Sequence, residues 1–218
     1  MNNNLTEIVF IIDRSGSMAG LEEDTIGGFN AMVEKQKKEP GEALLSAVLF
    51  SDHGSVIYDR VDIRKVEPMT DQQYQVGGCT ALLDAIGRAV HHIGNVHKYA
   101  REDDRPGKTI FVITTDGMEN ASREYTYEKV RRMVKDEQEK FGWEFLFLGA
   151  DMDAISAARS FGIRSDRAVR YERDRRGTEL NYEVLSRTVS EFRAGKEIIP
   201  GWSAPIEEDF KKRGGQSH

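Results

Sequence analysis

The sequence has a single cysteine and no long apolar run. Cys79 stands alone among 218 residues, which excludes a disulfide within the chain. No stretch approaches the roughly 18 consecutive apolar residues that indicate a membrane-spanning helix. The first ten residues also lack the basic segment and apolar run of a secretory signal. We therefore expect a protein of the cytoplasm, without a membrane anchor.

An excess of positive charge is missing as well. The chain has 31 Lys and Arg residues against 37 Asp and Glu residues, for a formal net charge of -6. Charges of both signs are interspersed, which argues against a surface for the phosphate backbone of a nucleic acid. A chain of this length can bury a sizeable core without disulfides or a structural metal, so we expect one main domain.

What the sequence does contain is a set of short, strongly apolar runs. Four of them read "EIVFIID", "ALLSAVLFS", "KTIFVITTD" and "WEFLFLGAD", with little alternation between apolar and polar residues. Such runs are typical of parallel strands that are buried on both faces of a sheet. Between them, apolar residues recur with helical spacing over 26–33, 82–93 and 130–141. The pattern predicts an α/β fold with a doubly wound, mainly parallel sheet.

One connection departs from this alternation. The run "SVIYDRVDI" follows "ALLSAVLFS" after a tight polar turn, which is too short for a helical crossover. We expect these two strands to form an antiparallel hairpin, with the second strand at one edge of the sheet.

The C-terminal quarter predicts further short elements. We expect a short helix over 153–162, an extended segment at 167–171, and a longer helix with Thr178 as its N-cap and Gly195 as its stop. From Lys196 onward, Pro200, Pro205 and several glycines leave no clear helical stripe. This divides the chain into a domain over 1–195 and a surface extension over 196–218.

The stretch "IIDRSGSMAG", residues 11–20, suggests a chemical function. Asp13, Ser15 and Ser17 occupy alternate positions directly after the first apolar run. Asp116 ends the third run, and Thr80 precedes the second helical pattern. In a doubly wound sheet, sites form outside the carboxyl ends of neighbouring strands. If the strands that end at Asp13 and Asp116 are neighbours, all five side chains face a common point.

These five side chains are hard oxygen donors. Two carboxylates and three hydroxyls suit Mg²⁺ or Mn²⁺ better than Zn²⁺ or copper. The two carboxylates balance the charge of a divalent ion, whereas the hydroxyls contribute only dipoles. Such an ion stays electrophilic and accepts a carboxylate from another molecule.

Together, "DRSGS", the threonine of "GGCT" and the aspartate of "TTDG" resemble the metal-ion-dependent adhesion site of von Willebrand factor type A domains. The resemblance covers roughly residues 5–195 and is strongest with the small, stand-alone bacterial members, which are cytoplasmic. It implies about six strands with one antiparallel edge and helices on both faces. It also implies Mg²⁺, with Mn²⁺ or Ca²⁺ as alternatives, held by Asp13, Ser15, Ser17, Thr80 and Asp116. Some ligands in this family act through water, and a Glu or Asp of a partner protein completes the sphere.

Our leading hypothesis is therefore a metal-dependent protein-binding module that is not an enzyme. One alternative is a metal-assisted hydrolase or phosphatase with Ser15 or Ser17 as nucleophile and His53 as the base. Another is a scaffold protein whose site rarely holds a metal. Self-association, with Glu207 or Glu208 of one copy reaching the metal of another, is a further option for the partner.

Three charged features near the motif have simpler interpretations. Asp84 is explained by the preference for acidic residues in the first turn of a helix, although it could also steady a metal-bound water. Glu119 is expected to be a solvated loop acid. The arginines of "RYERDRRG" are expected to lie in a solvated loop, with contact to an acidic partner as the alternative.

Overall fold

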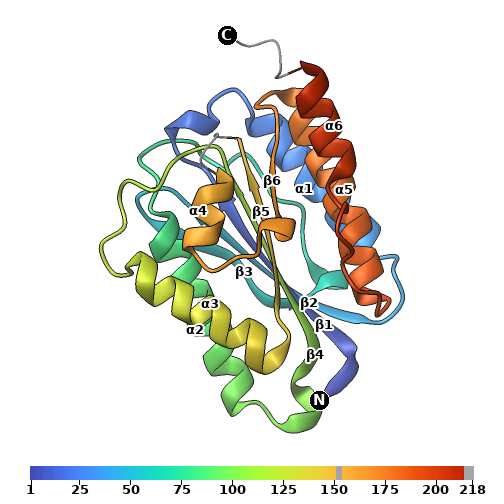
Figure 1. Cartoon of the computed structure of the whole chain (residues 1–218). Coiled ribbons are helices and arrows are strands. Elements are labelled where there is room, and N and C mark those ends of the chain that lie inside the picture. The colour runs from blue at the N-terminus through green and yellow to red at the C-terminus, as the bar shows by residue number, and fades with distance from the viewer. Residues whose placement is uncertain (151–153, 214–218) are drawn as a thin grey trace.

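A six-stranded sheet forms the centre of the protein in the computed structural model, which describes residues 1–150 and 154–213. Within this part of the chain the strand order is β3-β2-β1-β4-β5-β6 (Figure 1). All neighbours are parallel except β2 and β3, which form the expected antiparallel hairpin at one edge. The strands are β1 (Asn2–Asp13), β2 (Glu42–Phe50), β3 (Gly54–Asp62), β4 (Pro106–Thr115), β5 (Glu144–Gly149) and β6 (Ala168–Arg170). The predicted α/β fold, strand number and edge hairpin are confirmed.

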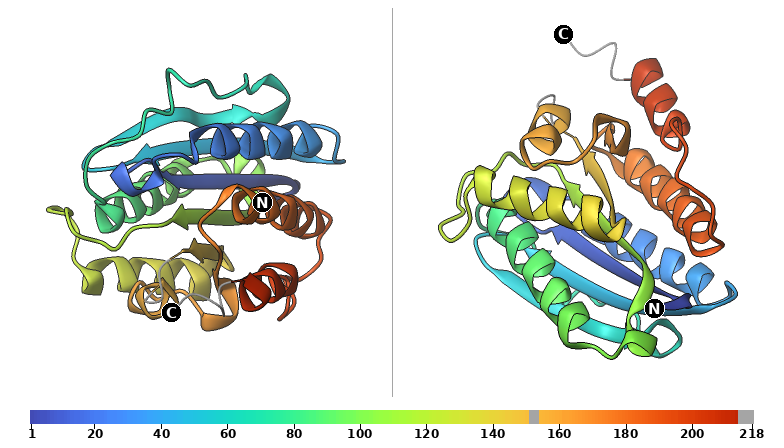
Figure 2. Two further views of the ribbon diagram at one scale, coloured as in Figure 1. Left: turned by 90° about the horizontal axis from the view of Figure 1, so that it is seen from above. Right: turned by 60° about the horizontal axis from the view of Figure 1, so that its bottom comes forward.

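Helices cover both faces of the sheet (Figure 2). On one face α1 packs beside α5, and α6 continues the layer along α5; on the other face α2 packs beside α3, which contacts α4. The helices are α1 (Glu22–Gln36), α2 (Leu82–Tyr99), α3 (Tyr127–Phe141), α4 (Ala154–Ser160), α5 (Arg175–Arg193) and α6 (Ala204–Arg213). The predicted beginning of the short helix, at residue 153, lies outside the described residues.

The strands lack polar alternation because both faces of the sheet are buried. Along β1, Ile8, Phe10 and Ile12 join the core beneath α1 and α5, whereas Val9 and Ile11 join the core beneath α2 and α3. All five are at most 1% exposed. Successive side chains of a strand point to opposite faces, so a strand between two helical layers needs apolar residues at every position.

The start of the longest helix differs from the prediction. Helix α5 begins at Arg175, and the carboxylate of Asp174 caps it by accepting a hydrogen bond from the backbone N of Gly177 (2.7 Å). Thr178 is therefore not the N-cap; it lies in the first turn and is buried. Asp is an equally good capping residue, and its position three residues before Gly177 fits the usual capping geometry. Gly195 follows the helix with a φ of +84°, which is the left-handed conformation expected of a glycine that ends a helix.

The expectation that no helix forms after Lys196 is wrong. Helix α6 forms there, with Pro205 in its first turn, where a missing N–H costs nothing. Ile198, Trp202 and Ile206 recur every four residues and are all buried in the core beneath α5. Only Ile206 lies in α6, but burial of all three side chains holds the segment against the core despite the prolines, because each large side chain contributes about 1.5–3 kcal/mol.

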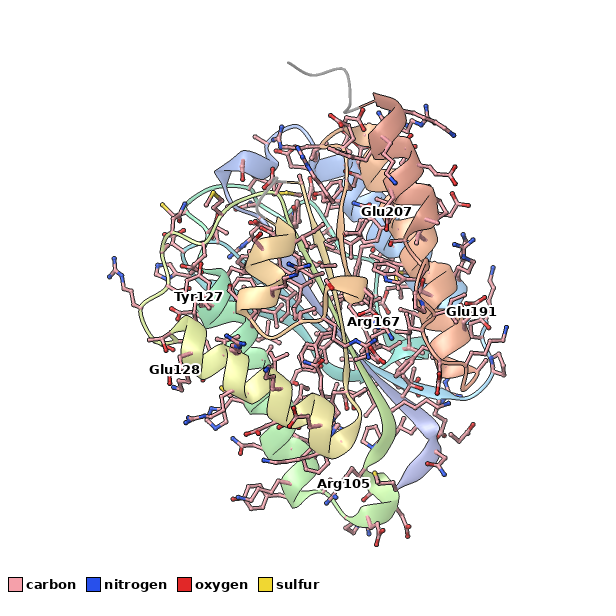
Figure 3. The ribbon with its side chains drawn as sticks, viewed as in Figure 1. Arg105, Tyr127, Glu128, Arg167, Glu191 and Glu207 are labelled. Atoms are coloured by element: carbon pink, nitrogen blue, oxygen red, sulfur yellow. The ribbon has the colours of Figure 1, made fainter. Side chains whose placement is uncertain are left out.

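Arg167 also attaches this segment to the sheet (Figure 3). Its side chain is 6% exposed, and the guanidinium donates to the carboxylate of Glu144 (2.9 Å) and to the backbone O of Ile198 (2.8 Å). Trp202 Nε1 donates to the backbone O of Asp166 (2.9 Å). Residues 196–213 are thus part of the packed structure. In the described part of the chain, no helix has the length and apolar character needed to span a membrane.

Candidate metal centre

The motif residues lie at the carboxyl ends of two neighbouring strands. Strands β1 and β4 are paired in parallel, with Ile12 beside Thr114, so the residues that follow both strands emerge at the same edge (Figure 1). Asp13 is the last residue of β1, and Asp116 comes directly after β4. The condition stated for the sequence motif, that these two strands are neighbours, is therefore met.

Asp13 is completely buried and held on both of its carboxylate oxygens. Oδ1 accepts a hydrogen bond from the backbone N of Ser15 (2.7 Å), and Oδ2 accepts one from the hydroxyl of Thr115 (2.5 Å). Burial raises the pKa of Asp13, and the nearby carboxylate of Asp116 acts in the same direction, against the lowering effect of these hydrogen bonds. The site therefore has a buried carboxylate that lacks a compensating positive charge.

The three hydroxyls converge beside Gly117. A methyl group on Gly117 would lie 2.7 Å from Thr80 Oγ1, 3.4 Å from Ser17 Oγ and 3.6 Å from Ser15 Oγ. Ser15 Oγ and Ser17 Oγ are 3.1 Å apart, and Ser17 Oγ donates to Asp116 Oδ1 (2.6 Å). The structure thus brings oxygens from three separate loops around one point beside Gly117. This point is open because glycine has no side chain to fill it.

This donor set suits a hard cation. Hydroxyl and carboxylate oxygens are the ligands that Mg²⁺, Mn²⁺ and Ca²⁺ prefer, and the hydroxyls supply dipoles at no charge cost. Over residues 1–150 and 154–213, no three His, Cys, Asp or Glu side chains gather where they could hold a metal. A metal at this site would therefore depend on the serine and threonine hydroxyls.

Arg173 is a site residue that the sequence did not reveal. It lies between β6 and α5, and its Nε donates to Asp116 Oδ2 at 2.6 Å. Its Nη2 donates to the backbone O of Ala19 (3.2 Å), in the loop that carries Ser17. Arg173 is exposed, as expected for a solvated loop, but that expectation missed its contact with the carboxylate of Asp116. The mixed charges of "RYERDRRG" gave no signal that could single it out.

Polar residues of the loop after β4 hold Thr80 and the start of α2 in place. Asn120 Oδ1 accepts from the backbone N of Thr80 (2.9 Å), and its own N donates to Thr80 O (3.0 Å). Glu119 is not a solvated loop acid: its carboxylate accepts from the backbone N of Leu83 (2.8 Å) and of Ser122 (2.8 Å). It thereby caps the first turn of α2 from outside the helix.

Asp84 has a structural role that goes beyond its place in the first turn of α2. Its two carboxylate oxygens accept from the backbone N of Arg123, Glu124 and Tyr125, each at 2.9 Å. Burial acts to raise the pKa of Asp84, but these backbone N–H groups outweigh it and the pKa is lowered. Asp84 therefore fixes the loop that follows Asp116.

A hollow lies beside one part of the site. A hollow of about 40 Å³ borders Asp116 and Gly117 and is lined also by Glu119 and Tyr127. His53, the proposed base of a hydrolase, has a side chain that is 90% exposed; its ion pair in the described structure is with Asp52, at 3.9 Å.

Comparisons with known proteins give structural relatives. Neither a scan against protein-family models nor a search of curated proteins gave a match. A von Willebrand factor type A protein from Catenulispora acidiphila has a TM-score of 0.54 and 16% identity, over 88% of this chain and 43% of that one. The ArnB paralog VWA2 from Sulfolobus acidocaldarius has a TM-score of 0.52 and 16% identity, over 88% and 45%.

A third relative has a metal in its own metal-ion-dependent adhesion site (MIDAS). Proximal thread matrix protein 1 from the mussel byssus, in a structure with a zinc-occupied MIDAS motif, has a TM-score of 0.58 and 15% identity. The match covers 85% of this chain and 46% of that one. The chain thus spans about half the length of these structures. From its strand order, its helical layers and these matches, the protein has the fold of von Willebrand factor type A domains.

Proposed function

We propose that this protein is a divalent-metal-dependent protein-binding module. Asp13, Ser15, Ser17, Thr80 and Asp116 would hold Mg²⁺, and a Glu or Asp side chain of a partner protein would complete its coordination. The observation that carries the proposal is the convergence of three hydroxyls beside Gly117, next to two buried carboxylates.

The charges of the site support a role in binding acidic groups. The charge of a divalent ion would offset the two buried carboxylates, while the hydroxyls add no further negative charge. When bound, the ion would supply a concentrated positive charge that attracts a carboxylate. Asp13 and Thr115 hold each other through a hydrogen bond, so the position of this carboxylate is set before any ligand arrives.

The relatives support the same class of function. The mussel protein has zinc in its MIDAS motif, which favours a divalent metal at the corresponding loops of this chain. A pilus adhesin, SpaC from Lactobacillus rhamnosus GG, also has a similar fold, with a TM-score of 0.59 and 11% identity over 86% of this chain and 30% of that one. A protein partner is consistent with the adhesive role stated in that name.

The hydrolase hypothesis has less support. The side chain of His53, the proposed base, is 90% exposed and is directed largely to solvent. General-base catalysis requires hydrogen-bond reach to the nucleophile, and in the described residues His53 makes no such bond with Ser15 or Ser17.

Calorimetric titration tests the metal site. We expect Mg²⁺ and Mn²⁺ to bind with a stoichiometry of one to the native protein. Thr80→Val keeps the side-chain shape and removes one hydroxyl, and Asp116→Asn removes one charge; both should weaken binding, the second more strongly. A scaffold protein without a functional site would give no binding heat with any of the three proteins.

Selection from a random peptide library tests the partner. Peptides retained by the immobilised protein in Mg²⁺ and released by a chelator should be enriched in Asp or Glu at one position. The Asp116→Asn protein provides the control, and it should retain few of them. A metal-independent selection, or one without acidic enrichment, would contradict the proposed docking chemistry.

A further inference from the structure

Among the described residues, one of the two buried carboxylates of the site pairs with a cation. Asp13 and Asp116 both have side chains with no exposed surface. In the described part of the chain, Arg173 is the basic residue that pairs with Asp116, and no ion pair is formed by Asp13. A buried carboxylate without a counter-charge is costly, so the guanidinium contributes to the stability of this arrangement.

Both carboxylate oxygens of Asp116 are already engaged. Oδ1 accepts from the hydroxyl of Ser17 at 2.6 Å, and Oδ2 accepts from Arg173 Nε at 2.6 Å. A hydroxyl can rotate its proton away and offer a lone pair to a metal, whereas a guanidinium has donors only. Ser17 can therefore become a co-ligand, but Arg173 cannot.

The contacts of Arg173 also allow its guanidinium to move away from Asp116. Its side chain is 42% exposed, and its second contact is one hydrogen bond of 3.2 Å to the backbone O of Ala19. The next residue, Asp174, caps α5 through Gly177. Release of Arg173 would therefore alter the conformation of the short segment before α5, while the Asp174 cap of the helix would stay in place.

We propose that Arg173 and the divalent ion compete for Asp116, and that Arg173 thereby sets the metal affinity of the site. This inference rests on the proposed function. In the metal-free protein Arg173 is the resident cation of the site. Metal entry displaces its guanidinium from Oδ2 and releases the segment between β6 and α5.

Metal affinity measured by calorimetry tests the competition. Arg173→Gln removes the charge and retains a group that can donate to Asp116. The hydrogen bond between Arg173 and Asp116 must break before an ion reaches Oδ2, and the loss of such a bond to a charged group changes an affinity on the order of tenfold. We therefore expect Mg²⁺ to bind Arg173→Gln about tenfold more tightly than the native protein.

Arg175→Gln is the matched control. Arg175 lies two residues away, has a side chain that is 78% exposed, and pairs with Glu179 (3.0 Å) and with Asp24 (3.6 Å). The same charge is removed from the same segment without a change at Asp116, so the Mg²⁺ affinity should stay within about twofold of native. Unfolding curves of both variants establish that they are folded.

Hydrogen exchange of the native protein provides a second measurement. Mg²⁺ should speed exchange of the backbone amides at residues 171–174, and in Arg173→Gln exchange there should be fast already without metal. Metal binding by Arg173→Gln but not by the native protein would also support the proposal.

The possible failures are distinguishable. Equal or weaker Mg²⁺ affinity in Arg173→Gln, with normal binding by the native protein, would overturn the competition and leave the metal module standing. Slower exchange at 171–174 on metal addition would also overturn it. No binding by either protein would overturn both the competition and the proposed function.

Discussion

Substitution of Gly117 by alanine tests whether the open point between the hydroxyls is what the site needs. The added methyl would lie 2.7 Å from Thr80 Oγ1, a distance that requires something to move. Gly117 does not have a positive φ, so alanine is compatible with its backbone. The change thus acts on the space between the hydroxyls and leaves all five proposed ligands in the sequence.

The size of the effect follows from these contacts. An ordinary contact begins at 3.4 Å, so Thr80 Oγ1 must retreat by 3.4 minus 2.7, or 0.7 Å, if the methyl stays in place. Mg²⁺ requires near-ideal octahedral geometry, and functional groups must be held within about 0.5 Å of their working positions. We expect Mg²⁺ affinity to fall by at least about tenfold, which corresponds to about 1.4 kcal/mol. Overpacking should lower the free energy of unfolding by about 1–3 kcal/mol.

Two assays separate these effects. Calorimetric titration gives the Mg²⁺ affinity, and urea unfolding in the presence of a chelator gives the stability of the metal-free protein. Gly27→Ala is the matched control, since Gly27 lies in α1 and an added methyl there would meet nothing within 4 Å. It should stabilise the protein by about 0.5–1 kcal/mol, because alanine favours a helix over glycine, and should leave metal binding unchanged.

Native-like Mg²⁺ affinity in a folded Gly117→Ala protein would refute this account of the site. It would mean that the hydroxyls of Ser15, Ser17 and Thr80 do not act together around the point beside Gly117. Loss of affinity in Gly27→Ala as well would show that the assay reports general destabilisation.

Three further changes test the contacts that support the site. Asp13→Asn should raise the free energy of unfolding of the metal-free protein at pH 7. The pKa of Asp13 is raised in the folded state, so its ionisation destabilises the fold as pH rises above about 4, the unfolded pKa. Urea unfolding measured against pH would show no increase in stability if the charge of this carboxylate were well compensated in the native protein. Asp84→Asn should cost about 1–3 kcal/mol at pH 7. Because the pKa of Asp84 is lowered in the folded state, its contribution to stability is complete above about pH 4 and is lost as pH falls through its folded-state pKa. The unfolding curves of native protein and variant should therefore converge in acid. A stability difference that stays constant with pH would contradict this. Trp202→Ala should cost about 3–5 kcal/mol by thermal or urea unfolding, because Trp202 is 5% exposed, and an unchanged midpoint would show that the segment before α6 does not stabilise the domain.

Local features of the sequence were enough to predict the architecture. Unbroken apolar runs such as "KTIFVITTD" indicated strands between two helical layers, and the short turn before "SVIYDRVDI" indicated the edge hairpin. The prediction failed where two signals competed. Pro200 and Pro205 suggested an open tail, but Ile198, Trp202 and Ile206 bury their side chains and a helix forms.

The sequence by itself determined the chemistry available at the edge of the sheet: two carboxylates and three hydroxyls, each next to the end of a strand or the beginning of a helix. Only the tertiary structure decided which groups meet there. Arg173 lies 57 residues from Asp116 in the sequence and shares with its neighbours the composition of a solvated loop. Its contact with Asp116 depends on how the segment between β6 and α5 returns across the sheet edge, and long-range packing decides such a path, since no local pattern encodes it.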